Sequence, residues 1–587
     1  MKHLTAPLLL ALAALPLHAE PPAEPAARLV VSGEVLHPVD DRLFGQFLEI
    51  ASWGEPGPDT LADPETGDLP PEVVDALREL HAPIVRFPGG IDVDRVDWTD
   101  RIDLPAADNP DAPAGVPTRP AGEGRPTLLD SGYPNRFGYD EFLRLTAELD
   151  AEALIVLNFL ETLYGDVPLE EGARHAAGLV AYLNAEVGAE LPEGMPDWPA
   201  LRAANGHPEP HGVPVFQVGN ETWNTGRERI GPAAEAAGVS PQEHVTRCLA
   251  AFGEAIHAVD PSVELICDSQ VFMDFWGEPV DKPVEEAFMF GVLSDPRVQE
   301  HYAHTTIHAY QPWGSDTVTV DGEEADAAAM SPEAAYLACV GIPNESAGSD
   351  PPVAVIRPRE QRLAAATGRR VAFTEWNWNG WGKGIPGGQN PGTRVYAASR
   401  AGGAGSYLNA MLRAGERSGG ASIGTQSMML ANNWFIGAVR VQEMPERSGP
   451  VPVVTPTGRA TGLYAEHHGD RRLATTWERQ PAEVVQDVVI GGTPVMSPMP
   501  RLDVVVTADG GHYYVHAVHR RWSEPGVLEL ALPTDAAATG VRHEVVAVDA
   551  GDGVYTAERR EAAVADAARL VLPPASVSVT VIPRGGG

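Results

Sequence analysis

Residues 369–378 read RRVAFTEWNW, and this stretch decides the fold. It contains an apolar run, Val371 to Phe373, with the composition of a buried strand. The run ends in Thr374 and Glu375, although an ionised carboxylate is costly to bury unless it has partners or a task. Apolar runs that end in polar side chains recur along the chain between residues 43 and 430.

Eight such runs are separated by segments whose apolar residues recur with the period of a helix, for example 138–150, 241–260 and 393–415. The runs are almost continuously apolar, which is typical of parallel strands covered on both faces. This alternation predicts an α/β fold, a (β/α)8 TIM barrel, with an open doubly wound sheet as the alternative. The expected strands are 43–50, 83–90, 153–160, 213–221, 262–270, 303–310, 369–378 and 421–430.

From about residue 440 the pattern changes to strict alternation of apolar and polar residues between Asp-Gly and Gly-Gly turns. This indicates a C-terminal antiparallel β-sandwich domain, which we expect the strand text at 28–38 to join. Two insertions rich in Pro, Gly, Asp and Asn, 91–137 and 186–212, are expected to be loops, the first on the C-terminal face of the barrel. The predicted division is a signal peptide (1–19), a linker with N-terminal strands (20–38), the barrel (39–435) and the sandwich (436–587).

The composition excludes some classes of partner. The formal net charge is -39, and lysine occurs only at positions 2, 282 and 383, so the phosphates of a nucleic acid would be repelled. No run after the N-terminus reaches the roughly 18 apolar residues that span a bilayer, so no membrane partner is expected. Residues 1–19 combine Lys2, an apolar segment and Leu17-His18-Ala19, which predicts export to the periplasm or the medium.

In a barrel of this kind the active site lies at the carboxyl ends of the strands. Polar side chains occupy that position in most of the expected strands: Glu49, Arg86, Asn158, Asn220, Glu221, His308, Tyr310, Glu375 and Gln426. Glu221 and Glu375 end the fourth and seventh strands, which face each other across the mouth. Two facing carboxylates are what glycoside hydrolysis needs. Trp223, Trp376, Trp378 and Trp381 follow the same strands, and indole faces suit sugar rings.

Several segments carry a resemblance to a known family. RFPGG (86–90), VGNETWN (218–224), IHAY (307–310), TEWNWNGW (374–381) and TQSMMLANNW (425–434) are similar to glycoside hydrolase family 51. That family includes the α-L-arabinofuranosidases and belongs to a clan of (β/α)8 retaining glycosidases.

The resemblance implies roles for individual residues. It makes Glu221 the acid/base and Glu375 the nucleophile. It implies that Glu49, Arg86, Asn220, His308, Tyr310 and Gln426 bind the sugar or tune the carboxylates. Trp223 and Trp376 are added to the expected sugar-binding set as the aromatic neighbours of the two glutamates, and Arg86 is expected to hold the charge of Glu375. One departure stands out: Ile91 occupies the position where the family usually has an asparagine that touches the furanose.

Alternatives remain at this stage. Ile91 and the insertions are compatible with a related glycanase that acts on xylan, glucan or galactan. A non-catalytic sugar-binding protein on the same barrel is the other class. His308 and Tyr310 alternate on one strand and could form a core pair. No cofactor is expected, because glycoside hydrolysis does not need one. No metal site is expected either, because His301, His304 and His308 do not all share one face of a strand.

Overall fold

The computed structural model describes residues 26–585 except 53, 96, 104–134, 223–226, 269–281, 311–316, 327–328, 342–355, 357, 379–392, 415–419, 444–449, 486, 491–492, 496, 551–554, 563 and 565. Most of the first insertion and the whole expected signal peptide therefore lie outside the described residues. Within this part of the chain, no helix has the length and apolar character that crossing a membrane requires.

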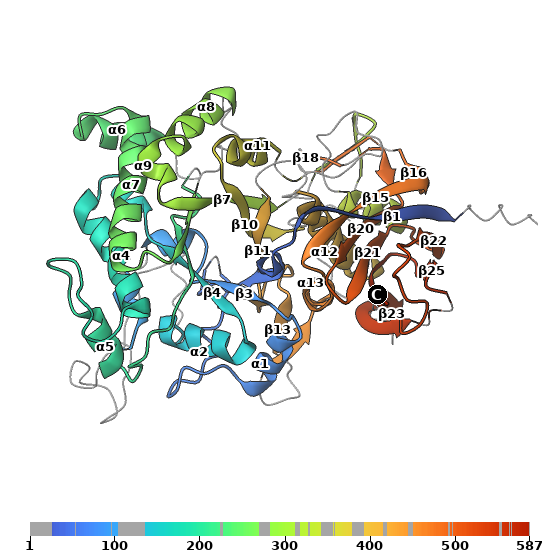
Figure 1. Cartoon of the computed structure of the whole chain (residues 1–587), viewed down its shortest axis with the longest axis horizontal. Helices are drawn as coiled ribbons and strands as arrows, with labels where there is room; N and C mark the ends of the chain where they lie inside the picture. Colours follow the sequence, from blue (N-terminus) through green and yellow to red (C-terminus); the bar gives the residue numbers. More distant parts are fainter. Residues whose placement is uncertain are drawn as a thin grey trace, which may run out of the picture.

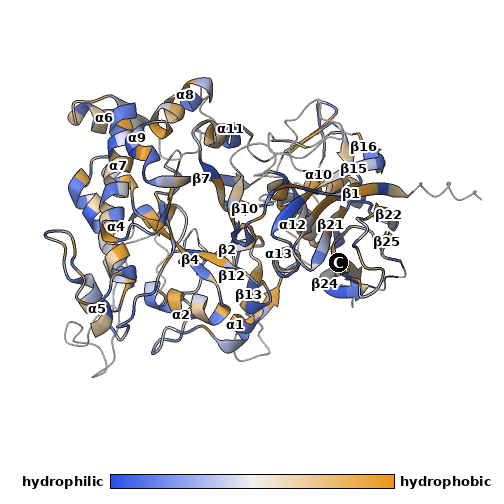
Figure 2. Ribbon diagram, in the orientation of Figure 1, coloured by the Kyte–Doolittle hydropathy of each residue, from blue (hydrophilic) through white to orange (hydrophobic). Residues whose placement is uncertain are grey.

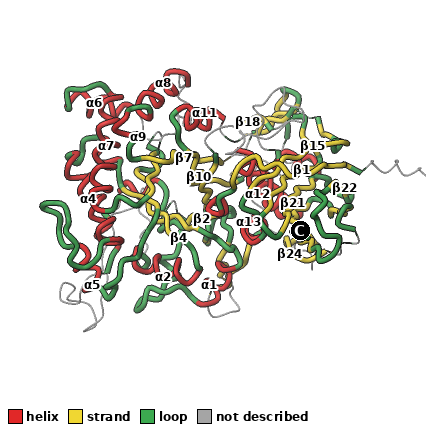
Figure 3. Tube along the Cα trace, in the orientation of Figure 1, coloured by secondary structure: helices red, strands yellow, loops and turns green. Residues whose placement is uncertain are grey.

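Eight parallel strands close into a barrel in the N-terminal two thirds of the chain, so the predicted TIM barrel is confirmed. The open sheet is excluded because every one of the eight strands pairs with two neighbours and the ring closes on itself, which leaves no edge strand. Figure 3 shows these strands ringed by helices. The strands in chain order are β2 (Gly45–Phe47), β3 (Ile84–Phe87), β4 (Glu152–Leu157), β5 (Val215–Val218), β6 (Glu264–Cys267), β7 (Tyr302–Tyr310), β10 (Arg370–Asn377) and β11 (Ala421–Ser427).

A layer of small and branched apolar side chains fills the barrel beneath its mouth. Alternate residues of the strands supply it, as the period of two requires. Val93, from the short helix η2 (Ile91–Arg95), packs on the same layer. Figure 2 shows β4 as one of the most hydrophobic strands. The other members are Ile84, Leu154, Val156, Val215, Ile266, Ala372 and Ile423.

The outer helices begin at the signals that the sequence carries. Ser240 accepts a hydrogen bond from the backbone of Glu243, and Pro241 opens helix α7. The helices are α1 (Pro71–Arg78), α2 (Tyr139–Leu149), α3 (Leu160–Leu163), α4 (Leu169–Asn184), α5 (Trp198–Ala204), α6 (Arg227–Ala236), α7 (Pro241–Val259), α8 (Lys282–Leu293), α9 (Pro296–Gln299), α10 (Pro332–Val340), α11 (Pro358–Ala366), α12 (Arg394–Ala414) and α13 (Pro456–Glu466).

The C-terminal unit is one nine-stranded sheet that folds over a core of its own. Leu528 and Leu570, near one end of the sheet, share this core with Val504 and Val515 near its middle. The strands follow the order β24 (Tyr555–Ala562), β23 (Arg542–Ala550), β26 (Ser576–Pro583), β21 (His512–His519), β20 (Leu502–Ala508), β15 (Arg471–Arg479), β1 (Ala27–Pro38), β22 (Gly526–Ala531) and β25 (Arg569–Leu572). The pairings are antiparallel except that of β1 with β22.

Helices α12 and α13 lie where the barrel and the nine-stranded sheet meet (Figure 1). Nearly every residue of α12 is buried, because one side faces β10 and β11 and another faces the sheet. Gly405 permits this approach, since a Cβ there would lie 2.9 Å from Val518 and 3.0 Å from Val577. The barrel and the sandwich thus share one apolar cluster.

Two smaller sheets connect the halves. Residues 430–466, which the sequence pattern assigned to the sandwich from 436 onward, first form β12 (Leu430–Ala431), β13 (Val439–Glu443), β14 (Pro450–Val454) and then α13. After β7 the chain forms β8 (Val318–Val320) and β9 (Glu323–Glu324), which are not part of the barrel. β8 pairs with β17 (Val488–Ile490) of the C-terminal region.

Candidate active site

The carboxyl ends of the barrel strands bring most of the predicted polar residues together. Glu375 lies two residues before the end of β10, and its side chain is 8% exposed. Arg86 Nη1 donates to Glu375 Oε1 over 3.0 Å, and the Tyr310 hydroxyl donates to Oε2 over 2.6 Å. Both oxygens of this buried carboxylate therefore have a donor, and one of the two donors is a cation.

Arg86 is itself held in one orientation. Its side chain is fully buried, and its other nitrogens donate to Asn220 Oδ1 over 2.5 Å and to Gln217 Oε1 over 3.1 Å. The guanidinium also lies 4.5 Å from the centre of the Phe47 ring. A buried cation with these contacts has little freedom, so it fixes Glu375 and Asn220 relative to each other.

His308 links the two glutamates. Its Nδ1 lies 2.8 Å from Glu221 Oε1 and 3.7 Å from Glu375 Oε1, and its Nε2 lies 3.0 Å from the Thr374 hydroxyl. One oxygen from each glutamate and a ring nitrogen of His308 all lie within 4.8 Å of one another. Retaining glycosidases place their two carboxyl groups about 5–5.5 Å apart, and inverting ones place them farther apart.

The surroundings raise the pKa values of Glu221 and His308. Burial raises the pKa of Glu221, as do the charges of Glu375 and Asp268, while His308 opposes the shift. Burial alone would lower the pKa of His308, but the charges of Glu375 and Glu221 raise it above its ordinary value. Burial beside Glu375 also raises the pKa of Tyr310, which keeps its hydroxyl a donor.

A β-bulge turns Glu375 into the barrel. In the pairing of β10 with β7, Ala372 lies opposite Thr306 and Glu375 opposite His308, so β10 has one extra residue. Strict alternation from the inward Ala372 would place Thr374 and Trp376 inside. With the bulge, Thr374 and Glu375 both contact His308.

The same bulge sends Trp376 out of the barrel, so the structure does not bring this predicted sugar-binding residue to the site. Trp376 is 1% exposed and stacks on Tyr407 of α12, with ring centres 5.5 Å apart. Trp378 also packs on α12, beneath the guanidinium of Arg400. Trp223 and Trp381 lie outside the described residues.

Glu49 lies beside the nucleophile candidate. It is 5% exposed, and its Oε1 accepts the backbone N–H of Gly90 over 3.0 Å. Burial and the charges of Glu375 and Asp92 raise its pKa well above the ordinary value. A Cβ at Gly90 would lie 2.9 Å from Glu49 Oε1 and 3.6 Å from Glu375 Oε1, so this glycine keeps the space between them open.

Two other polar residues at strand ends are placed differently. Gln426 is fully buried and donates to the carbonyl of Ile436 over 3.2 Å, where it braces the loop after β11. Asn377 donates to the same carbonyl. Asn158 lies 3.2 Å from Glu161 rather than near the two glutamates.

Sequence reasoning missed two acids at the site. Asp268 follows β6 and accepts hydrogen bonds from Thr222 and Thr306. The rule that found Glu221, a polar residue at the end of an apolar run, applies equally to Asp268. Asp94, in η2, accepts from the backbone of Phe159 and Leu160, and no comparable signal marks it.

Groups that could hold a metal occur in two places among the described residues. One is Glu221, His308 and Glu375, already described. The other is Asp103, Asp140 and His207, whose candidate ligand atoms also lie within 4.8 Å of one another. Asp140 there accepts the Tyr182 hydroxyl, so hydrogen bonds within the cluster account for much of its arrangement.

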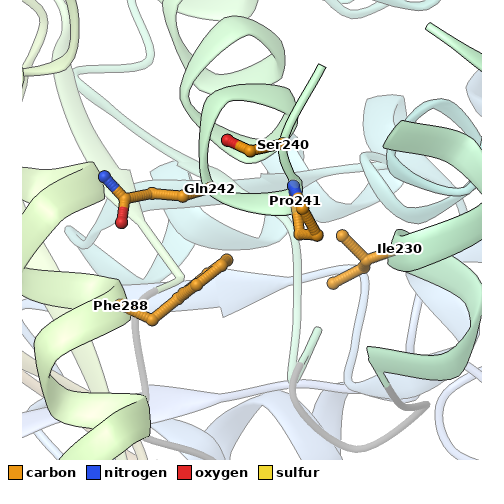
Figure 4. Close-up of a pocket in the computed structure, with 5 residues that line it drawn as sticks. All are labelled: Ile230, Ser240, Pro241, Gln242 and Phe288. Carbon is orange, nitrogen blue, oxygen red and sulfur yellow. The ribbon is translucent and has the colours of Figure 1, made fainter. Parts of the chain in front are cut away.

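A cavity of about 380 Å³ lies on the outside of the barrel. Figure 4 shows its lining: Ile230 of α6, Ser240, Pro241 and Gln242 at the start of α7, and Phe288 of α8. These residues are not at the carboxyl ends of the strands. The cavity is therefore separate from the paired glutamates.

Comparisons of sequence agree with this geometry. A family model described as "Alpha-L-arabinofuranosidase 1 domain" matches residues 76–311. An exo-alpha-(1->6)-L-arabinofuranosidase of Bifidobacterium longum is 27% identical over 277 residues, which are 45% of this chain and 44% of that protein. An intracellular exo-alpha-(1->5)-L-arabinofuranosidase 1 of Bacillus subtilis is 28% identical over 249 residues, 41% of each protein. The chain thus spans less than half the length of these curated relatives.

Comparisons of structure cover nearly the whole chain. The thermostable family 51 alpha-L-arabinofuranosidase of Thermotoga petrophila RKU-1 superposes with a TM-score of 0.62 at 18% identity, over 95% of this chain and 100% of that one. The family 51 enzyme AbfB of Bifidobacterium longum has a TM-score of 0.64 over the same shares. At this identity the likeness establishes the fold. With the sequence matches, it confirms the resemblance predicted from the motifs.

Proposed function

We propose that this chain, as a member of glycoside hydrolase family 51, is a retaining glycoside hydrolase that releases α-L-arabinofuranosyl groups from plant or algal polysaccharides or their oligosaccharides. The observation that carries the proposal is the pair Glu221 and Glu375, with oxygens within 4.8 Å of each other and His308 in contact with both. A separation of about 5 Å suits a double displacement, because it leaves no room for a water between Glu375 and the anomeric carbon, so that Glu375 attacks directly.

In the first step Glu375 attacks the anomeric carbon while Glu221 protonates the departing oxygen. Arg86 and Tyr310 hold the two oxygens of Glu375, so its attack needs little rearrangement. The raised pKa of Glu221 suits an acid that must carry a proton near neutral pH.

In the second step the same Glu221 takes a proton from water. Once Glu375 is bonded to the sugar, its negative charge is gone. That charge is one of the causes of the raised pKa of Glu221, so the pKa falls at the stage where a base is needed. The pair thus supports both halves of the reaction.

Two further groups face the place of the sugar. Asn220 Nδ2 is buried and finds no acceptor among the residues that the structure describes, while its Oδ1 is held by Arg86, so the amide is oriented to donate to a sugar hydroxyl. Glu49, whose pKa is raised, adds a carboxyl group that can donate as well as accept.

The test is release of nitrophenol from 4-nitrophenyl α-L-arabinofuranoside by the wild type and by Glu375→Ala. We expect turnover by the wild type and a loss of about 10⁴-fold or more in the variant, because the covalent step has no substitute. Glu264→Gln, at the opposite end of the barrel, is the matched control and should stay active. Equal turnover in wild type and Glu375→Ala would refute the assignment.

A second candidate is a related glycanase that acts on another sugar. Ile91 favours it, because this apolar side chain replaces a furanose-contacting asparagine usual in the family. A wild type that ignores the arabinofuranoside and hydrolyses xylan, glucan or galactan, again with loss in Glu375→Ala, would select this candidate.

Export is also a proposal, supported by the composition of residues 1–19. Several relatives carry the word intracellular in their names. Cell fractionation followed by sequencing of the mature N-terminus decides the matter: a mature chain that starts near Glu20 outside the cytoplasm supports export, and an intact Met1 or Lys2 terminus in the cytoplasm contradicts it.

A further inference from the structure

The backbone at Glu221 is strained. Its φ is +47°, in the left-handed region that a residue with a side chain rarely adopts, and Gly219, two residues earlier, has a φ of +80°. Such a conformation costs free energy and persists only where its surroundings hold it. Here the turn brings the Glu221 carboxyl to His308.

A buried carboxylate holds the chain directly after this turn, and a second one lies near the residue before it. The second is Asp94, which is 2% exposed and accepts the backbone N–H groups of Phe159 and Leu160. Asp268, 6% exposed, accepts the backbone N–H of Thr222 over 2.6 Å and its hydroxyl over 3.0 Å. Glu221 therefore lies between Asn220, whose side-chain oxygen accepts from Arg86, and Thr222, which donates to Asp268.

Asp268 is fixed in turn by the barrel. It follows β6, its backbone N–H reaches the carbonyl of Val218, and its second oxygen accepts the Thr306 hydroxyl over 2.8 Å. Thr306 lies two residues before His308 on β7, so the anchor and the partner of Glu221 share one strand. This arrangement transmits the geometry of β6 and β7 directly to the turn.

We propose that Asp268 is a positioning residue for the acid/base Glu221: through Thr222 it holds the strained turn that aims the Glu221 carboxyl. The inference rests on the proposed function, and it adds a residue that the family resemblance did not supply. Asp268 contacts Thr222 and Thr306, and it acts on the reaction through Glu221.

The charge of Asp268 acts in the same direction as its hydrogen bonds. Within the described part of the chain, the charged or titratable groups that face Glu221 include His308 and Tyr310 from β7, Glu375 from β10, and Asp268. Burial raises the pKa of Glu221, and Glu375 and Asp268 raise it further. Asp94 faces Asp268 from η2, and burial raises its pKa to about 7 with a contribution from Asp268. Removal of the Asp268 charge should therefore lower the pKa of Glu221.

The first test does not depend on the substrate. Carboxyl carbons of glutamate are labelled with ¹³C, the Glu221 signal is assigned with Glu221→Gln, and its titration is followed by NMR in wild type, Asp268→Asn and Glu264→Gln. We expect a lower midpoint in Asp268→Asn and an unchanged one in Glu264→Gln, whose carboxylate lies on the same strand near Arg42 and His304. An unchanged midpoint in Asp268→Asn overturns the electrostatic part.

The second test separates positioning from general stability. Arabinofuranosides with good and poor leaving groups need the acid to different extents, and a general acid contributes about 10²–10⁴-fold. We expect Asp268→Asn to lose about 10-fold or more of kcat/KM with a methyl or sugar leaving group and less than about 3-fold with 2,4-dinitrophenol. The alkaline limb of its pH profile should move to lower pH.

Equal losses for both leaving groups, with an unmoved pH profile, would show that Asp268 only supports the fold. If Asp268→Asn does not fold, Thr306→Val removes one anchor of Asp268 and should show the same selectivity with a smaller loss. A wild type without turnover would contradict the proposed function, whereas the NMR titration would still decide the role of Asp268.

Discussion

At the residue scale, the site depends on buried groups that restrain one another. Arg86 has no exposed surface and contacts Glu375, Asn220 and Gln217, so a change at any of these leaves the guanidinium with an unmatched donor. Breaking a buried pair of this kind costs about 3–5 kcal/mol. The consequence is that substitutions in this network alter both stability and activity, and the informative ones separate the two.

Glu49 offers such a separation. The pKa of Glu49 is higher in the folded chain than its ordinary value of 4.5. Above pH 4.5 the carboxyl group therefore loses its proton in the unfolded chain but keeps it in the folded chain. As a result, the free energy of unfolding falls as the pH rises from 4.5 toward the pKa of the folded chain. Glu49→Gln removes this cost. We expect its Tm to exceed that of wild type by about 2 °C or more at about pH 8 and to match it at about pH 4.

The contrast for that experiment is Glu264→Gln. His304 and then Arg42 lower the pKa of Glu264 to about 2, so its contribution to stability is present above 4.5 and is lost as pH falls through 2. Its Tm should fall below that of wild type at about pH 8. A Glu49→Gln variant that also loses stability at this pH would contradict the account of Glu49.

A substitution at Gly90 tests the open space between the carboxyl groups of Glu49 and Glu375. A methyl group there would lie 2.9 Å from Glu49, so Gly90→Ala must displace that side chain. We expect KM to rise about tenfold or more, an effect worth about 1.4 kcal/mol, with Tm little changed. Gly231→Ala, where the added carbon meets nothing within 4 Å, is the control and should leave the kinetics unaltered.

At the element scale, the bulge in β10 determines which side chains reach the site. It places Glu375 beside His308 and Trp376 against Tyr407. Trp376→Ala should therefore act as a core substitution and cost about 3–5 kcal/mol of unfolding free energy. Thermal unfolding should show a large fall in Tm, while the KM of the folded fraction stays near wild type. A rise in KM without loss of stability would contradict this view and would indicate that Trp376 binds the sugar.

At the scale of the whole molecule, the barrel and the nine-stranded sheet share one apolar cluster, so we expect them to unfold together. Tyr407 of α12 and Tyr464 of α13 belong to the same apolar cluster as Val518 and Val577 of the sheet. A chain that ends at residue 468 would expose this surface, and we expect it to be insoluble or to lack near-ultraviolet circular dichroism. A soluble, active truncated barrel would contradict this view.

Much of this architecture follows from the sequence because its signals are local. Apolar runs set the strands, and polar residues at their ends identify Arg86, Glu221, His308 and Glu375. The bulge has no such signal, since one extra residue in β10 is defined only by its pairing with β7. Trp376 was included in the expected sugar-binding set as the aromatic neighbour of Glu375, and adjacency in sequence does not show which face of the strand a side chain takes. Asp94 was missed for a similar reason, because it acts on the backbone of residues more than 60 positions away.

The most direct test of the central claim is the configuration of products formed with azide. Glu221→Ala with azide should regain activity and give the arabinofuranosyl azide with the configuration of the substrate, because Glu375 still forms the intermediate. Glu375→Ala with azide should give the inverted azide in a single displacement. NMR of the products distinguishes the two. The same configuration from both variants, or rescue of neither while the wild type turns over, would contradict the roles assigned to Glu221 and Glu375.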